Sequence, residues 1–370
     1  MPIRRGAMFR VISIWRFLLV GAAAAMVATA CGSSTASTPS PSPVDVGSGS
    51  LTGAGSTFDN PLFTKAFFDY SAKYPQVTVN YQPVGSGAGI QQFIKQTVDF
   101  GATDVPMAAA DITSAGGPAT LTQIPVTLGV VSIAYNVSGV SSLQLDAPTL
   151  AGIFLGHIKK WNDPAIAALN SGVNLPNEAI TVEHRSDGSG TTYIFTDYLA
   201  KVSPEWQSTV GTAKSVKWPV GVGGSGNQAV AQGITSTEGA IGYVELAYVV
   251  QTGMHQAAIK NANGKFVAAT VAGATAAAAQ NNSITATNFS IVNEPGDATY
   301  PIAGFSWVIL YTSYSDTNKG KAVVNLFKWL VTTGQSEGAA LQYAPLPSAV
   351  QQLALSNLKL IKAGGTAVLS

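Results

Sequence analysis

The chain has 370 residues, 46% of them hydrophobic and only 11% charged, and its formal net charge is +1 at pH 7. This composition provides for a large buried core, and the lack of any basic run argues against a nucleic-acid partner. At ordinary domain sizes, the length beyond the first fifty or so residues suits two domains.

The first 31 residues predict an export signal that ends at the only cysteine of the chain. Several arginines precede the apolar stretch Phe17–Ala30, and Cys31 follows it. Small residues before a cysteine resemble a lipoprotein processing site, although Ala28 stands where an aliphatic residue is usual. A lone cysteine cannot form an internal disulfide. We therefore expect residues 1–31 to be a lipoprotein signal peptide, with Cys31 lipidated (palmitate) as a membrane anchor; a free or buried thiol is the alternative.

Residues 32–50 are dense in Ser, Thr, Pro and Gly. They hold too few apolar side chains to pack, so we expect a disordered linker that separates a folded domain from its anchor. Later in the chain, the run closest to a membrane span is Val267–Ala279. It is short and consists mostly of Ala, Gly and Thr, which argues against a span.

From residue 51 onward, short apolar strands alternate with amphipathic helices. The expected strands lie at 51–54, 77–81, 98–102, 126–135, 179–182 and 239–244, and helices are expected around 58–70, 90–94, 150–155, 193–199 and 227–234. This alternation predicts an α/β fold with mainly parallel sheets and flanking helices. In such folds, ligands bind beyond the carboxyl ends of the strands.

Three turns place a hydroxyl residue at the start of an expected helix. They contain Ser56-Thr57, Ser86-Gly87 and Ser189-Gly190-Thr191. Each offers a side-chain hydroxyl together with backbone N–H groups that have no partner inside the helix. One such turn is commonplace, because Ser and Thr are frequent N-caps. Three of them in one chain favour an anion site.

The segment 183–191 adds a positive charge to the third turn. Arg185 ends an apolar strand, and its guanidinium fork fits two oxygens of a tetrahedral oxyanion. Asp187 lies two residues further on and can hold Arg185 in place. Taken alone, this segment fits oxyanion capture and an ordinary strand–turn–helix corner equally well.

Several of these segments together resemble a known family, the extracytoplasmic phosphate-binding proteins of high-affinity phosphate ABC importers. The resemblance is carried, in order, by residues 51–58, 98–104, 185–191, 217–221 and 239–245, and it is weakest across 267–300. It implies a two-lobed periplasmic-binding-protein fold of type II with the ligand cleft between the lobes. Residues 51–125 plus 299–370 would form lobe I, and residues 126–298 lobe II.

The resemblance also implies the ligand contacts and the partners. The family's contacts fall on Thr57, Phe58 (through its backbone N–H), Ser86, Asp104, Arg185, Ser189, Gly190 (through its backbone) and Thr191. The implied partners are inorganic phosphate and the permease subunits and ATPase of an ABC importer, and the expected protein is a monomer without cofactor at the outer face of the cell membrane. The chain departs from the family pattern at Ser56, Thr103 and His184.

Asp104 is the informative member of this set, because a carboxylate repels an anion unless the ligand carries a hydrogen. Hydrogen phosphate and dihydrogen phosphate can donate one to Asp104, whereas sulfate cannot. We therefore expect Asp104 to select phosphate. From the residues alone, an N-cap or a surface carboxylate is the competing interpretation.

Other functions fit the sequence less well. A nucleophile elbow needs a glycine two residues before Ser189, where Asp187 stands. The three histidines are not at metal-ligand spacing, so we expect neither a metal site nor catalytic residues. The stretch Gly221–Gly226 matches G-x-G-x-x-G but is expected to be a flexible turn. A phosphate-ester hydrolase and a binding protein for another oxyanion, such as sulfate, remain the alternatives, and a purely structural surface protein is a third.

Overall fold

The computed structural model describes residues 45–281 and 283–370. The predicted signal peptide, Cys31 and most of the predicted linker lie outside the described residues. Residues 45–50, which the sequence placed in the linker, belong to the folded part, because Val46 is buried in the core and Gly49 begins the first strand. Within the described part of the chain, no helix combines the length and the hydrophobicity that a membrane crossing requires.

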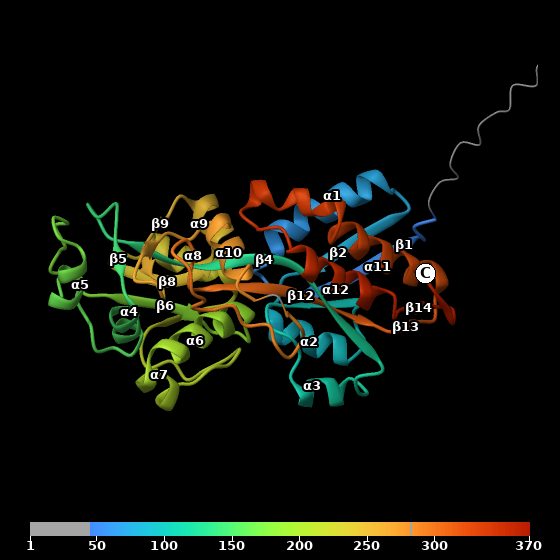
Figure 1. Ribbon diagram of the computed structural model, residues 1–370, viewed down its shortest axis with the longest axis horizontal. Helices are drawn as coiled ribbons and strands as arrows, with labels where there is room; N and C mark the ends of the chain where they lie inside the picture. Colours follow the sequence, from blue (N-terminus) through green and yellow to red (C-terminus); the bar gives the residue numbers. More distant parts are fainter. Residues whose placement is uncertain (1–44, 282) are drawn as a thin grey trace, which may run out of the picture. The chain divides into compact units, whose positions relative to one another are not determined.

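Nine strands of the described residues form one sheet, with neighbours in the order β2-β1-β3-β12-β4-β8-β6-β7 and β9 paired to β4 (Figure 1). Their bounds are β1 (Gly49–Gly55), β2 (Val77–Gln82), β3 (Phe100–Thr103), β4 (Leu121–Asn136), β6 (Thr181–Arg185), β7 (Val222–Gly224), β8 (Ala240–Glu245), β9 (His255–Gln256) and β12 (Ala303–Tyr311). Two short sheets accompany it: β5 (Gln144–Leu145), β10 (Ala258–Lys260) and β11 (Phe266–Val267) form one, and β13 (Ser313–Tyr314), β14 (Lys362–Ala363) and β15 (Thr366–Ala367) form the other.

Each end of the large sheet has the predicted parallel pairing. β1 pairs in parallel with β2 and β3, and β6 pairs in parallel with β7 and β8. The two long strands between these ends, β4 and β12, run antiparallel to each other and to their outer neighbours. The fold is therefore a mixed α/β architecture with two parallel halves joined through β4 and β12, as the two-lobed resemblance implied.

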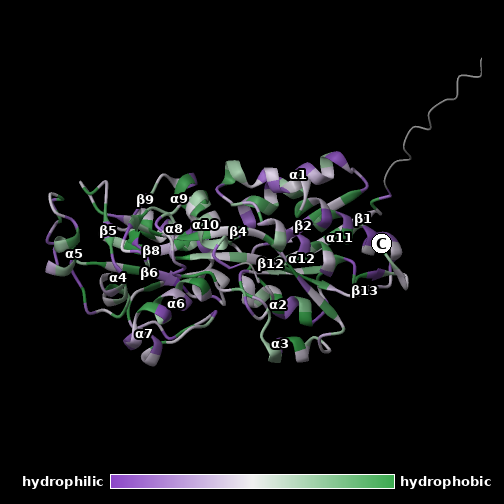
Figure 2. Cartoon of the chain, viewed as in Figure 1, coloured by the Kyte–Doolittle hydropathy of each residue, from purple (hydrophilic) through white to green (hydrophobic). Residues whose placement is uncertain are grey.

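Helices flank both halves of the sheet. They are α1 (Asn60–Lys73), α2 (Ser86–Ile94), α3 (Ala109–Ser114), α4 (Ala147–Phe154), α5 (Pro164–Leu169), α6 (Gly190–Val202), α7 (Pro204–Thr209), α8 (Gly226–Ser236), α9 (Leu246–Thr252), α10 (Val271–Ala278), α11 (Thr317–Leu330) and α12 (Ser348–Leu358), with 3₁₀ turns η1 (Thr333–Glu337) and η2 (Ala339–Leu341). The helix α1 shows why they form: it buries Leu62, Phe63, Ala66, Phe67 and Tyr70 on one face, while its two lysines lie on the exposed side together with Phe68 (Figure 2).

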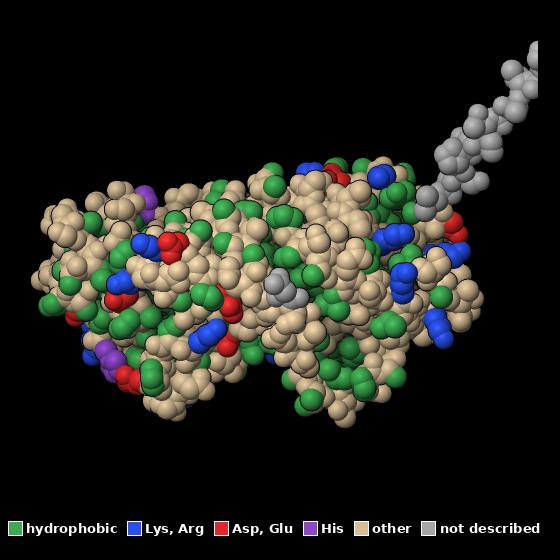
Figure 3. Space-filling model, viewed as in Figure 1, with side chains coloured by type: hydrophobic (Ala, Val, Ile, Leu, Met, Phe, Trp, Pro, Cys, Tyr) green, Lys and Arg blue, Asp and Glu red, His purple; other side chains and the backbone are tan. Residues whose placement is uncertain are grey.

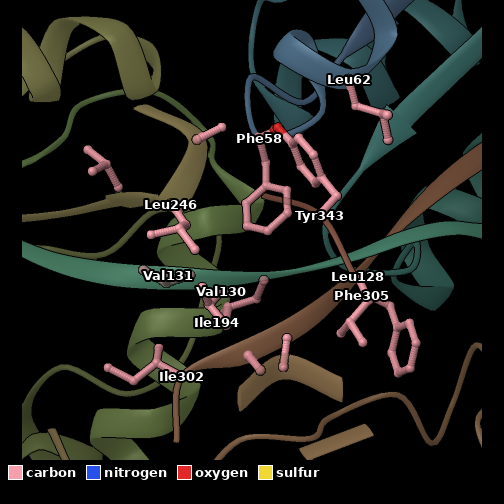
Figure 4. Close-up of a cluster of buried hydrophobic side chains, with 14 of the residues drawn as sticks. Phe58, Leu62, Leu128, Val130, Val131, Ile194, Leu246, Ile302, Phe305 and Tyr343 are labelled. Carbon is pink, nitrogen blue, oxygen red and sulfur yellow. The ribbon is translucent and has the colours of Figure 1, made fainter. Parts of the chain in front are cut away.

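One large hydrophobic cluster continues from one half of the sheet to the other (Figure 4). Phe58, just before α1, is fully buried there and meets the ring of Tyr343 edge-on at 6.1 Å. The hydroxyl of Tyr343 donates to the carbonyl oxygen of Phe58 at 2.5 Å. The core thereby fixes the turn between β1 and α1, which is one of the three hydroxyl turns.

Charged side chains are sparse on the face seen in Figure 3, which is hollowed at one edge between the regions of α7 and α3. Lys214, in the segment after α7, reaches Asp111 of α3 with an Nζ–Oδ2 distance of 3.3 Å. This ion pair connects the two halves of the fold.

Candidate functional site

The turn after β1 is built around Ser56. Its backbone N–H donates to the carbonyl of Ala102 at 3.0 Å, so the turn folds over the end of β3. The Ser56 hydroxyl donates to Asp104 Oδ1 at 2.5 Å and accepts from the backbone N–H of Phe58 at 2.9 Å. The N–H of Phe58, which the resemblance assigns to the ligand, is thus engaged with Ser56 in this structure. Tyr248 donates to the carbonyl of Thr57 at 2.7 Å and holds that residue in place.

The turn after β6 carries a buried ion pair. The Arg185 side chain is almost wholly buried and forms a bidentate ion pair with Asp187. Its Nε donates to Oδ1 at 2.7 Å and its Nη2 donates to Oδ2 at 2.5 Å. Asp187 Oδ1 also accepts from the N–H of Gly226 at 3.0 Å. Burial raises the pKa of Asp187, but the hydrogen bond and charge of Arg185 outweigh it, and the pKa lies below its ordinary value. The guanidinium is therefore held at a fixed orientation by an ionised partner.

Four hydroxyl side chains belong to this group of turns, and each already accepts a hydrogen bond through its oxygen. Ser189 is the N-cap of α6 and accepts from Thr192 N, Ser86 accepts from Gly190 N, and Thr191 accepts from Arg185 Nη1 and from Asn227 Nδ2. Thr57 accepts from the backbone and the side chain of Asn227, at 3.1 and 3.0 Å.

Among the described residues, none of these four hydroxyls donates to a protein acceptor, so each keeps its hydrogen for another partner. All four are buried. Together with the positive charge of Arg185, they form a site suited to an anion.

Asp104 is the carboxylate in this group of donors. It follows β3, is 3% exposed, and its backbone N–H approaches Ser86 Oγ at 3.4 Å. It is neither an N-cap nor a surface residue, so the competing interpretation of Asp104 is wrong. Burial raises its pKa to about 6, although hydrogen bonds from Ser56 and Ser306 and the charge of Arg185 act in the opposite direction.

Gly190 allows Asp104 to approach the α6 turn. A Cβ added at Gly190 would lie 2.5 Å from Asp104 Cβ, 2.6 Å from its backbone nitrogen and 2.6 Å from its Oδ2. No other residue fits there, because the backbone nitrogen cannot move aside as a flexible side chain could. Asp104 Oδ2 consequently faces the Ser189–Thr191 turn, whereas Oδ1 accepts from the hydroxyls of Ser56 and Ser306.

The structure brings together the side chains of Thr57, Ser86, Asp104, Arg185, Ser189 and Thr191, with Phe58 and Gly190 beside them. These residues come from turns at β1, β3 and α2 in one half and at β6 and α6 in the other. Hydrogen bonds from Gly190 to Ser86 and from Asn227 to Thr57 connect the two halves.

Sequence reasoning missed Asn227, which is fully buried and connects Thr57 to Thr191. Its only local signal is its place just after the glycine-rich stretch.

The expectation of a flexible turn over Gly221–Gly226 is wrong in part, because Val222–Gly224 form β7 and pair in parallel with β6. Gly226, with φ of +79°, then turns the chain into α8 and directs its N–H at Asp187.

Within residues 45–281 and 283–370, no group of three or more His, Cys, Asp or Glu side chains is arranged to hold a metal ion. The chemistry of the site is that of hydrogen-bond donors around one carboxylate. It can bind and orient an oxyanion.

Comparison with known proteins identifies what this chain is similar to. A model of the PBP superfamily domain matches residues 38–332. The phosphate-binding protein PstS of Pasteurella multocida (strain Pm70) is 43% identical over 310 residues, covering 82% of this chain and 88% of that protein. PstS of Xylella fastidiosa (strain 9a5c) is 42% identical over 301 residues, covering 80% and 81%. The structure of a human phosphate binding apolipoprotein superposes with a TM-score of 0.68 at 20% identity, over 86% of this chain and all of that one, and supports the fold.

Proposed function

The chain belongs to the PBP superfamily and to the PstS family of phosphate-binding proteins, and on this basis we propose that it captures inorganic phosphate outside the cytoplasmic membrane for an ABC importer. The observation that carries the proposal is a buried carboxylate, Asp104, in the same site as four hydroxyls that accept hydrogen bonds and keep a hydrogen to donate, those of Thr57, Ser86, Ser189 and Thr191. A site of donors alone would take any oxyanion. Adding one acceptor favours an oxyanion that still carries a hydrogen.

The site offers several hydrogen-bond donors, as a phosphate ion that leaves water requires. An anion that leaves water loses a large solvation energy, which the site must replace with many aligned hydrogen bonds. A hydrogen bond to a charged group contributes about 1.5–3 kcal/mol, so several are required. Arg185 supplies the positive charge, Thr57, Ser86, Ser189 and Thr191 supply hydroxyls, and Gly190 lies at the N-terminal end of α6, where the helix dipole favours an anion.

The proposed ligand set is the one that the resemblance implied, with Asp187 orienting Arg185. Sulfate as the main ligand is disfavoured, because it offers no hydrogen to Asp104. Calorimetric titration with phosphate and with sulfate tests this choice directly. Tight phosphate binding with little or no sulfate binding is expected, and equal affinity for the two anions would contradict it.

A phosphate-ester hydrolase is the remaining alternative, and no residue of the site stands as an activated nucleophile. The Ser189 hydroxyl accepts from the α6 backbone, and none of the three histidines of the chain is among its hydrogen-bond partners in the described structure. Release of phosphate from a model ester at a rate above the uncatalysed one would favour the hydrolase.

We further propose that the ligand draws two lobes together, lobe I being 51–125 plus 299–370 and lobe II being 126–298. Thr57, Ser86 and Asp104 would belong to lobe I, and Arg185 with the α6 turn to lobe II. A ligand that contacts both lobes shifts the population toward the closed state. The bonds between Ser86 and Gly190 and between Lys214 and Asp111 are of the kind that closure would form. Small-angle scattering should show compaction on adding phosphate, and an unchanged profile would speak against closure.

The lipid anchor at Cys31 and the partners are part of the same proposal. A monomer held at the outer face of the membrane by a palmitoylated Cys31 would deliver phosphate to the permease subunits and their ATPase. The intact mass of the native protein tests the anchor. A mass without the increment of a lipid would contradict the proposed anchor at Cys31. The proposal that the protein binds phosphate would not be affected.

A further inference from the structure

A second carboxyl group lies behind Asp104 and takes no part in the site described above. Asp59 stands at the start of α1, where an aspartate ordinarily caps the helix, yet its side chain makes no capping hydrogen bond. It is fully buried and points inward to Ser306 of β12, with Asp59 Oδ2 2.6 Å from Ser306 Oγ. Its other oxygen, Oδ1, has no hydrogen-bond partner among the described residues.

Ser306 stands between the two carboxyl groups. Its Oγ lies 2.6 Å from Asp59 Oδ2 and 2.8 Å from Asp104 Oδ1, with the carbonyl of Thr103 at 3.3 Å. A serine hydroxyl has one hydrogen to donate. If both carboxyl groups were ionised, one of the two short contacts would bring oxygen lone pairs together without a hydrogen. If one carboxyl group holds a proton, both contacts are hydrogen bonds.

The surroundings decide which carboxyl group holds the proton. Asp104 Oδ1 also accepts from Ser56, and the charge of Arg185 acts on Asp104, so the anion is favoured there. The described ionisable groups that act on Asp59 or feel its charge are Asp104, Tyr81, Glu245, Tyr248 and Tyr343. None of them is a cation. Burial and the charge of Asp104 raise the pKa of Asp59 well above its ordinary value.

We propose that Asp59 is a protonated positioning residue that donates through Oδ2 to Ser306, so that the Ser306 hydrogen points at Asp104 Oδ1. Asp104 then remains an anion whose Oδ1 accepts from Ser56 and Ser306 and whose Oδ2 faces the α6 turn, where the backbone of Thr191 also favours the ionised form. Without the proton on Asp59, Asp59 Oδ2 would compete with Asp104 Oδ1 for the single Ser306 hydrogen. The consequence for anion choice rests on the proposed function, whereas the location of the proton does not.

The geometry is built into one half of the fold and needs no lobe closure. Ser56, Asp104 and Ser306 lie on or directly after β1, β3 and β12, and β3 is hydrogen-bonded to both other strands. The register between β12 and β4 shifts between Ser306 and Trp307. Such a bulge re-aims a side chain, which here places Ser306 Oγ between the carboxyl groups.

Infrared spectroscopy of the phosphate-free protein tests where the proton is, since a protonated carboxylic acid has a carbonyl band that a carboxylate lacks. Asp59→Asn should remove one component of this band, and Asp104→Asn should not. Glu245→Gln is the matched control, because Glu245 is a second buried acid with a raised pKa and should account for a different component. Loss of the component in Asp104→Asn alone, or in neither aspartate variant, would overturn the proposal.

If Asp59→Asn folds poorly, Ser306→Ala keeps the test decisive, and if it folds well, Asp59→Leu adds a comparison of phosphate affinities. Ser306→Ala retains both carboxyl groups and should shift the Asp59 component, because the acid loses its acceptor; an unshifted band would contradict the proposal. Asp59→Leu should weaken phosphate binding by about fivefold to tenfold, the factor of one ordinary hydrogen bond. Asp59→Asn, whose amide can still donate to Ser306, should rescue it, and equal losses in both variants would refute donation as the role of Asp59.

These readouts separate two failures. If the band behaves as expected but no variant and no wild-type sample binds phosphate, the proposed function is wrong and the proton assignment stands. If phosphate binds tightly and the band does not change, the function stands and the assignment is wrong.

Discussion

Replacing Asp104 by asparagine would exchange an acceptor for a donor at almost unchanged shape. The amide oxygen can take the place of Oδ1 and keep the hydrogen bonds from Ser56 and Ser306, now 2.5 and 2.8 Å long. The amide nitrogen then takes the place of Oδ2, which faces the α6 turn. A ligand hydrogen at that point would meet an N–H group instead of a carboxylate.

The expected effect is a change of preference more than a loss of binding. Phosphate loses one hydrogen bond to a charged group, worth about 1.5–3 kcal/mol, which is roughly a tenfold to hundredfold change. Sulfate gains a donor and no longer meets a buried negative charge. A site built around a ligand hydrogen ordinarily rejects the analogue that lacks it by about 10⁴–10⁵-fold. We expect the phosphate-to-sulfate affinity ratio to fall by at least roughly a hundredfold.

Calorimetric titration of both anions into wild type and variant at neutral pH measures this ratio. Asp59→Asn is the matched control, since it makes the same chemical change in the neighbouring carboxyl group and should keep the wild-type ratio. A wild-type ratio in Asp104→Asn would refute the assignment of Asp104 as the selective group.

Three further predictions concern the same site. Arg185→Ala should weaken phosphate binding by at least about a hundredfold, because the anion loses a charged hydrogen-bond donor and then lies near the unpaired carboxylate of Asp187; calorimetry that finds wild-type affinity would show the site to be misplaced. Gly190→Ala should weaken binding by about tenfold to a hundredfold, since the added Cβ meets the Asp104 backbone; Gly152→Ala in α4, where the added Cβ meets only the flexible end of the Ile158 side chain, is the matched control. Sulfate rejection should weaken as the pH falls through about 6, where Asp104 gains a proton and becomes a donor; titrations across this range should show the trend in wild type and not in Asp104→Asn.

Local sequence was enough to predict the parts of the site that lie within one turn. Arg185 and Asp187 are two residues apart, and the hydroxyl turns are helix starts, so their spacing carries the information. The family resemblance added Phe58 and Asp104 and joined the three hydroxyl turns and Arg185 into one ligand set. The alternation of strands and helices likewise gave the α/β class, because it depends on patterns of a few residues.

The parts that were missed depend on contacts between distant segments. Asn227 is 170 residues from Thr57, and Ser306 is 202 residues from Asp104. No local pattern tells which face of β12 reaches the end of β3, since that follows from strand order and from the bulge. Asp59 resembles an ordinary helix cap in the sequence, and only packing reveals that it turns inward. The antiparallel pairing of β4 and β12 is undetermined locally for the same reason.

The bulge opposite β4 has a mechanical consequence. Ser306 pairs with Thr127 and Trp307 with Pro125, so Val126 is the extra residue, and its carbonyl accepts from the side chain of Gln335 instead of from β12. The chain leaves proposed lobe I for lobe II at this same residue. An interrupted ladder bends more easily than a continuous one, so if the proposed lobes rotate, we expect the hinge at this point. A hinge at this point would lie directly opposite Ser306, the residue that donates to Asp104, so the strand position that orients the carboxylate would also be the position where the lobes turn.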